Sequence, residues 1–282
     1  MAGIQLPGRF TSQPQYPAQV NWGNPITRGL IVAINPGGGM VEAVTRRVIT
    51  DRHIGTDLDV SVEGERFRTN AVSEYARIPS IPGSMRPALA ASIFWMGEYL
   101  GASTNSAMLF GLNHNANGDA VPYVSVTLKR GTAFLDDLLQ INDGTTSRNV
   151  AVTQARPTTG RVKMLGRTIT GTQNVQRRIV GVADYNASAT WTYSAIAYGA
   201  GAELAIGDPL TLQARNANAS MAVGYIWDRY ITDAERQSVM DFPWQIWQAP
   251  GRIFPISDAA AASGFKPYWS SQRPRVYGAG VR

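Results

Sequence analysis

The chain has 282 residues, a formal net charge of +6, no cysteine and two histidines. These numbers exclude a disulfide framework, a thiol nucleophile and a metal site built from several histidines. With 44% hydrophobic and 16% charged residues the chain is expected to fold, because disordered chains are poorer in apolar residues and richer in charge.

The first 23 residues are predicted to form an extended N-terminal arm. They contain Pro7, Pro14 and Pro17 and show no apolar periodicity, which is typical of irregular backbone. The segment lacks the charged start and the apolar stretch of a secretory signal, and no run approaches the roughly 18 apolar residues of a membrane span. We therefore expect synthesis in the cytoplasm and no membrane contact.

Residues 24–247 are predicted to form one all-β domain. Its first signal is the apolar run Gly29–Asn35, followed by Pro36 and three glycines, which is typical of a buried strand and a turn. Turn-forming clusters such as Asn142–Thr145 and Asp184–Asn186 separate the later apolar stretches. Many short strands without helical crossovers predict a two-sheet sandwich rather than a doubly wound sheet. The further predicted strands are Glu74–Ile78, Ala90–Tyr99, Ala107–Leu112, Tyr123–Lys129, Asp137–Ile141, Val150–Thr153, Arg161–Leu165, Arg178–Ala183, Thr190–Ala197, Leu210–Ala214 and Met221–Tyr230.

One short helix is predicted near the end of this domain. Thr232 and Glu235 have the spacing of a capping box, in which each side chain bonds the other residue's backbone N–H. Asp233 adds negative charge to the first turn, where the helix dipole favours it. The helix is expected to end near Phe242, because Pro243 disfavours helical backbone at the residue before it.

Residues 248–282 are predicted to form an extended C-terminal arm that binds a partner. After Pro250 the apolar periodicity ends, and an alanine-rich stretch leads into a terminus rich in aromatic and arginine side chains. These residue types are enriched at protein interfaces. The expected contact residues are Phe265, Tyr268, Trp269, Arg273, Arg275 and Tyr277.

Several sequence blocks resemble the concanavalin A-like (LamG-type) proteins of tailed bacteriophages and prophages. Asn24–Ile31 is similar to the opening of that family, Val223–Arg236 and Asp241–Trp247 to its last strand, helix and ending, and Gln272–Val281 to its terminus. Phe242 stands where the family has asparagine. The resemblance implies a concanavalin A-like two-sheet jelly-roll sandwich with one short C-terminal helix, located in a virion. Folds of this kind host lectins, glycosidases and structural modules alike.

No catalytic centre is expected. Glycosidases need two carboxylates that flank the scissile bond, and the nearest pair, Glu63 and Glu65, is separated by Gly64, which predicts a turn. Asp136 and Asp137 would point to opposite faces of a strand. The sequence also has no Gly-x-Ser-x-Gly nucleophile motif and no phosphate-binding loop. We therefore expect neither enzyme activity nor a cofactor.

Calcium and nucleic acid are two further ligands to consider. Asp57 with Asp59, or the loop of Asn115, Asn117 and Asp119, could supply oxygen ligands to calcium. The loop lacks a bidentate glutamate and the pattern also suits an ordinary turn, so no metal site is assigned. Only three of the 26 basic residues are lysines, and the arginines are scattered rather than clustered. Nucleic acid is therefore not an expected partner.

Two functions from different classes fit this sequence. The first is a structural component of a tailed-phage particle, a decoration, tail or baseplate-associated protein whose arms bind other phage structural proteins and copies of itself. The alternative is a glycan-binding module that contacts the host cell surface. Trp95, Tyr123 or Trp191 would then stack on sugars, although their strand positions also suit the core. A depolymerase ranks last, because the carboxylate pair is missing.

Overall fold

The computed structural model describes residues 10–248 apart from short gaps, and the chain divides into the units Met1–Ala249 and Pro250–Arg282. The described residues all lie in the first unit. The gaps are residues 11, 15–17, 39–40, 50, 54–57, 62–63, 70–74, 103–106, 115–123, 131–136, 154–156, 199–200 and 208–217.

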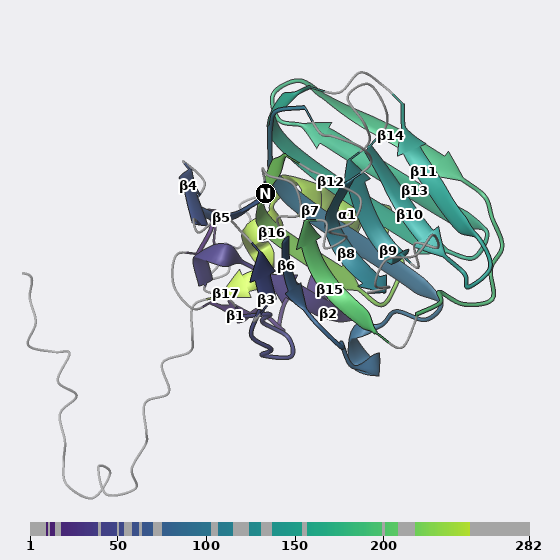
Figure 1. The fold of residues 1–282 in the computed structure, drawn as a ribbon. Helices are drawn as coiled ribbons and strands as arrows, with labels where there is room; N and C mark the ends of the chain where they lie inside the picture. The colour runs from purple at the N-terminus through teal and green to yellow at the C-terminus, as the bar shows by residue number, and fades with distance from the viewer. Residues whose placement is uncertain are drawn as a thin grey trace, which may run out of the picture. The chain divides into compact units, whose positions relative to one another are not determined.

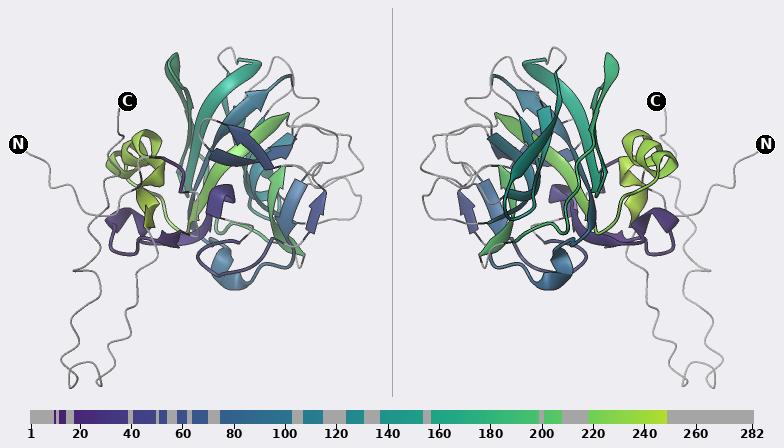
Figure 2. Two further views of the ribbon diagram at one scale, coloured as in Figure 1. Left: turned by 90° about the vertical axis from the view of Figure 1, so that its left-hand side faces the viewer. Right: turned by 90° about the vertical axis from the view of Figure 1, so that its right-hand side faces the viewer.

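Two antiparallel sheets form the first unit (Figures 1 and 2). This arrangement confirms the predicted jelly-roll β-sandwich. The seven-stranded sheet has the order β11 (Ser147–Val152), β10 (Asp137–Asn142), β9 (Val124–Arg130), β8 (Ala107–His114), β15 (Ala202–Gly207), β6 (Tyr75–Ile78) and β3 (Asp51–His53). The eight-stranded sheet has the order β14 (Ala183–Ala189), β13 (Thr172–Ile179), β12 (Thr159–Ile169), β7 (Ala90–Leu100), β16 (Ala219–Trp227), β5 (Gly64–Thr69) and β4 (Leu58–Ser61), with β2 (Leu30–Ile34) paired to β16.

Short elements complete the described part of the chain. A two-stranded sheet joins β1 (Gln19–Val20) to β17 (Trp247–Gln248). The helix α1 spans Asp233–Asp241. The short 3-10 helices are η1 (Pro25–Thr27), η2 (Pro36–Gly38), η3 (Gly83–Met85) and η5 (Pro243–Ile246).

The main hydrophobic core lies between the two sheets, because alternate side chains of each strand point inward. Trp95 on β7 is 1% exposed, and its ring stacks on that of Tyr99 with 5.9 Å between the centroids. Gly224 on β16 leaves space for Phe110 of the opposite sheet, since a Cβ atom there would lie 2.8 Å from the Phe110 ring. Burying a side chain such as Phe110 contributes about 1.5–3 kcal/mol.

A second core covers the outer face of the eight-stranded sheet. The elements α1, η5 and β1 pack there against side chains that β7, β12 and β16 turn away from the main core. Gln13 is buried in the same layer, and its Nε2 donates to Asn35 Oδ1 at 3.0 Å and to the Ala222 carbonyl at 3.2 Å. The described part of the predicted arm over residues 1–23 is therefore packed on the domain.

Helix α1 begins and ends where the sequence predicts. The Thr232 hydroxyl accepts the Glu235 backbone N–H at 3.2 Å, and the Glu235 carboxylate accepts the Thr232 N–H at 2.8 Å, which confirms the capping box. Val239 and Met240 are buried on the inward side of the helix. Phe242 is the C-cap residue and Pro243 opens η5.

The predicted strand Arg178–Ala183 is wrong, because a hairpin turn divides it. Strand β13 ends at Ile179, the chain turns over residues 180–182 with Gly181 at φ +80°, and β14 begins at Ala183. The predicted turn Asp184–Asn186 is consequently the start of an edge strand. The β-branched valines at the turn continue the apolar pattern across it.

One other predicted strand also differs from the structure. Thr190–Ala197 is irregular: the Trp191 backbone N–H bonds the Gln173 side chain at 2.8 Å, and its carbonyl accepts the Gly171 N–H at 2.6 Å. Leu210–Ala214 lies outside the described residues, whereas β15 was not predicted.

A buried carboxylate ties the segment after β2 to the sheet. Glu42 is 0% exposed, and its Oε1 accepts the backbone N–H groups of Ala33 at 2.9 Å and Val44 at 2.8 Å. Its Oε2 accepts both the N–H and the hydroxyl of Thr45, each at 2.6 Å. Four donors thus converge on one side chain.

We expect Glu42→Gln to lower the free energy of unfolding by about 2–4 kcal/mol, because the amide group would face N–H donors with its own donor and leave them unpaired in the interior. Urea unfolding followed by tryptophan fluorescence measures the change. An effect below about 0.5 kcal/mol, typical of a surface substitution, would contradict this role.

Candidate functional site

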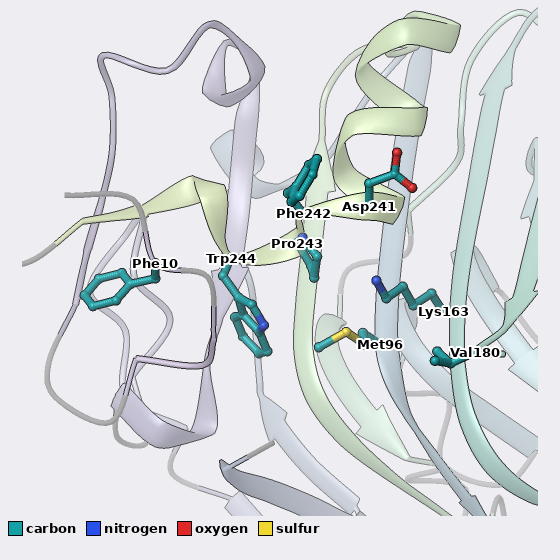
Figure 3. Close-up of a pocket in the computed structure, with 8 residues that line it drawn as sticks. All are labelled: Phe10, Met96, Lys163, Val180, Asp241, Phe242, Pro243 and Trp244. Atoms are coloured by element: carbon teal, nitrogen blue, oxygen red, sulfur yellow. The ribbon is translucent and has the colours of Figure 1, made fainter. Parts of the chain in front are cut away.

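A small pocket lies where α1 passes into η5 on the outer face of the eight-stranded sheet. Its volume is about 160 Å³, which is below the roughly 300–1,000 Å³ of drug-sized sites and suits one small group. Figure 3 shows Met96 of β7 and Lys163 of β12 pointing from the sheet toward the segment Asp241–Trp244. The lining residues are Phe10, Met96, Lys163, Val180, Asp241, Phe242, Pro243 and Trp244.

The pocket combines apolar rings with charged groups. Trp244 is 7% exposed and belongs to the second core, whereas Phe242 is 65% exposed although it is a large aromatic residue. Val180, in the β13–β14 turn, is also exposed. An exposed ring beside hydrogen-bonding groups is the combination from which sites for amphipathic small molecules are built.

Lys163 anchors the end of the helix at this pocket. Its Nζ donates to the Met240 carbonyl at 2.6 Å, one of the carbonyls left without an intrahelical partner at the end of α1. A cation is favoured at this end by the helix dipole. The interaction fixes the last turn of α1, and with it Asp241, above β12.

Arg178 of β13 joins the pocket to the neighbouring edge strand. Its Nε and Nη2 donate to the two carboxylate oxygens of Asp184, both at 2.7 Å, and its Nη1 donates to Asp241 Oδ1 at 2.5 Å. Gln237 also donates to both oxygens of Asp241 at 3.0 Å. Burial acts to raise the pKa of Asp241, but the hydrogen bonds from Arg178 and Gln237 outweigh it and lower that pKa. Asp241 is therefore a carboxylate at neutral pH.

A row of polar side chains continues from this ion pair along β13 and β14. Register pairs Arg178 with Asp184, Gln176 with Asn186 and Asn174 with Ser188, so these side chains share one face of the sheet. The opposite face of the same strands carries core residues such as Val175. We call the outward set the polar sheet face; its residues are Asn174, Gln176, Arg178, Asp184, Asn186 and Ser188.

Helix α1 lies beside the eight-stranded sheet (Figure 2) and is tied to it at its other end as well. Arg167 of β12 donates to Asp233 Oδ1 at 2.7 Å, to the Ile231 carbonyl at 2.8 Å and to Asn174 Oδ1 at 2.9 Å. The guanidinium also stacks over the Tyr230 ring at 4.5 Å. The helix is thus held at both ends by basic side chains of the sheet.

Three described residues that the sequence singled out, Trp95, Trp191 and Asp137, do not line this pocket. Trp95 is in the main core, and Trp191 is half-buried against that core with the Arg148 guanidinium 6.0 Å from its ring. Asp137 is fully buried and pairs with Arg177 at 2.9 Å. Outside the described residues lie Tyr123, Glu63, Asp136, Asp57, Asn115, Asn117 and Asp119, and all six predicted arm contacts, Phe265, Tyr268, Trp269, Arg273, Arg275 and Tyr277.

The residues of the pocket were not predicted as a site. Phe242 carried a signal, since it departs from the asparagine of the resembling family at the end of the helix. Lys163 and Arg178 gave none, because they lie on neighbouring strands and meet Asp241 only through the packing of α1. Their convergence is a product of tertiary structure.

The described ranges of the chain hold neither a cluster of metal-binding side chains nor a membrane-spanning helix. They contain no group of three or more His, Cys, Asp or Glu side chains placed to hold a metal ion. Within the same ranges, no helix has the length and apolar character needed to cross a membrane.

No protein-family model and no curated protein matches the chain, but solved structures share its fold. The binding domain of Paraclostridial Mosquitocidal Protein 1 is similar over 77% of this chain and 52% of that one, with 9% identity and a TM-score of 0.52. Trypanosoma rangeli sialidase in complex with sialic acid is similar over 76% of this chain, with 12% identity and a TM-score of 0.50. For Ruminococcus gnavus IT-sialidase CBM40 bound to α2,3-sialyllactose, the coverage is 62% of this chain and 95% of that one, with 9% identity and a TM-score of 0.45.

The chain spans about a third of the sialidase and about half of the toxin's binding domain. At these identities the likeness shows a β-sandwich fold and not a shared activity. The resemblance of the sequence blocks to phage proteins remains a prediction.

The N-terminal end of α1 provides a test of how the helix is held. Arg229 binds Glu235 through two hydrogen bonds, at 2.7 and 2.8 Å, and Glu235 also closes the capping box. The Arg229 hydrogen bonds are the main reason that the pKa of Glu235 falls from 4.5 to about 2. A depressed carboxyl pKa stabilises the fold above the unfolded-state value and ceases to do so as the pH falls through the folded-state value.

We expect Glu235→Gln to lower the free energy of unfolding by about 1–2 kcal/mol at pH 7, a value reduced for partial solvent exposure of the pair. Glutamine keeps the capping geometry, so the loss isolates the ion pair. Urea unfolding between pH 7 and pH 2.5 should show the difference from wild type shrinking below about pH 4.5. A difference that does not change with pH would show that the ion pair is not its source.

Proposed function

We propose that this β-sandwich is a glycan-binding module and that the pocket beside Phe242 takes one sugar ring. The observation that carries the proposal is the exposed Phe242 ring next to Lys163 and Asp241. A sugar ring has an apolar C–H face and an edge of hydroxyl groups. The first matches an aromatic ring, and the second matches charged hydrogen-bonding side chains.

Two further points support a sugar ligand. The polar sheet face extends from the pocket and exposes Asn186 and Ser188, whose amide and hydroxyl groups can both donate and accept hydrogen bonds. Among the proteins of similar fold is the T. rangeli sialidase in complex with a sugar, sialic acid. A module of this type would bring the protein that carries it to a polysaccharide or a cell surface.

We expect Phe242→Ala to weaken glycan binding about tenfold, because an aromatic contact of about 0.5–1.5 kcal/mol is lost together with apolar burial. Phe242→Tyr should keep most of the affinity. A glycan array identifies the ligand, and titration calorimetry with that ligand measures each variant.

Leu89→Ala is the matched control, since Leu89 is also 65% exposed but does not line the pocket. This variant should bind like wild type. If Phe242→Ala also binds like wild type, the sugar does not stack at this pocket. If the wild-type chain gives no saturable signal with any glycan, the proposed function is wrong.

We propose as a second function that the C-terminal segment fastens the protein to other subunits of a virion, formed in the host cytoplasm. The specific observation is compositional: residues 250–282 form a unit of their own and carry Phe265, Tyr268, Trp269 and Tyr277 with several arginines. These are the residue types on which interface energies concentrate. Both functions are compatible, because the pocket lies in the other unit.

We expect the double variant Tyr268→Ala, Trp269→Ala to lose association with partner subunits while keeping the unfolding profile of the wild type. Copurification of tagged and untagged copies, produced together with the proteins encoded beside this chain, measures the association. Equal copurification of variant and wild type, or none for either, would contradict the assembly role.

A further inference from the structure

We propose that the pocket selects neutral sugars over acidic ones because Asp184 and Asp241 occupy the guanidinium of Arg178. This inference rests on the proposed glycan-binding function and names the ligand class of the same site. The selectivity depends on which charged side chains can still bind a ligand, and their hydrogen bonds and exposure show which ones can.

The positive charges at the pocket are already bonded to protein groups. Hydrogen bonds to Asp184 and Asp241 use Nε, Nη1 and Nη2 of Arg178, which are all the nitrogens of the guanidinium. Lys163 Nζ donates to the Met240 carbonyl at 2.6 Å. The carboxylate of an acidic sugar would have to compete with two protein carboxylates for the N–H groups of Arg178 that these bonds leave over.

The carboxylates are the more exposed members of this cluster. The side chains of Asp184 and Asp241 are 38% and 36% exposed, against 18% for Arg178. A ligand that approaches the pocket and the polar sheet face therefore meets negative oxygens before it meets the guanidinium. Close like charges repel and thereby reject the wrong ligand.

The same two carboxylates suit a neutral sugar. A carboxylate is an acceptor only, and sugar hydroxyl groups are donors that can bind it by charge-assisted hydrogen bonds. Asn186 and Ser188 lie exposed in the next positions of the polar sheet face and offer both donors and acceptors. Two carboxylates balance the two cations here, so the net charge of +6 is not concentrated at this site.

The test uses an array on which each glycan backbone is present as a neutral form, a sialylated form and a form extended at the same position by a neutral sugar. The probes are lactose and N-acetyllactosamine with these extensions. Wild type should bind the neutral forms about tenfold more tightly than the sialylated ones. The neutral extension should lower the affinity less than sialylation does, and this comparison separates the effect of charge from the effect of size.

The double variant Asp184→Asn, Asp241→Asn should reduce this preference to about threefold or less, because it frees the guanidinium and removes the repelling charges. Asp143→Asn is the control for charge, since it removes one carboxylate charge from the β10–β11 turn of the other sheet, where asparagine can keep the turn's hydrogen bonds. It should leave the preference unchanged. Raising the salt concentration should also reduce the wild-type preference without any substitution.

The possible failures are distinct. Binding of sialylated forms as tightly as neutral ones, or a preference that neither the double variant nor salt alters, would overturn the selectivity and leave the glycan site standing. Absence of binding to every probe on the array would overturn the proposed function, and the selectivity with it.

Discussion

The position of the pocket depends on one buried tyrosine. Tyr225 of β16 stacks on Phe94 at 5.6 Å, and its hydroxyl accepts the Trp247 Nε1–H at 2.7 Å while it donates to the Pro243 carbonyl at 2.8 Å. Burial raises its pKa well above the usual value, so the hydroxyl keeps the proton that it donates. Pro243 directly follows Phe242, and this hydrogen bond therefore fixes the backbone on which the exposed ring is displayed.

Because α1 and η5 are held from several sides, the side chains that line the pocket do not have to become ordered when a ligand binds. The sheet holds α1 through Arg167 at its first turn and through Lys163 and Arg178 at its last. Side chains whose positions are set by packing and by supporting hydrogen bonds lose little entropy when a ligand binds. A short helix with a low intrinsic stability is thereby made into a rigid wall of the site.

The sequence predicted the fold and the helix because both are encoded in local patterns. The structure confirms the capping box at Thr232 and Glu235 and the helix end before Pro243. It also confirms the predicted strand Ala90–Tyr99, which is β7. The β13–β14 hairpin was missed because Val180 and Val182 continue an apolar run through the turn. The polar residues of β14 have the composition of a turn, but at the edge of a sheet they remain in contact with water.

The site could not be predicted in the same way. Lys163, Arg178 and Asp241 come from two strands and a helix end, and no short segment contains more than one of them. Aromatic residues were the natural candidates, yet Trp95 is central to the core, where large rings contribute most by burial. In the sequence Phe242 is only a departure from a family pattern, and its exposure follows from tertiary packing that no periodicity describes.

The use of arginine in this domain links its composition to the character of its surface. Arg177 forms a fully buried pair with Asp137, and Arg130 lies 3.9 Å from the Tyr99 ring while it donates to backbone carbonyls. Arg77 pairs with the buried Glu203 at 3.0 Å. These side chains serve as internal cross-links, a role that suits the planar fork of guanidinium better than the ammonium of lysine. A basic sequence can in this way present sites without excess positive charge, so the ligand class has to be inferred from individual ion pairs rather than from the net charge.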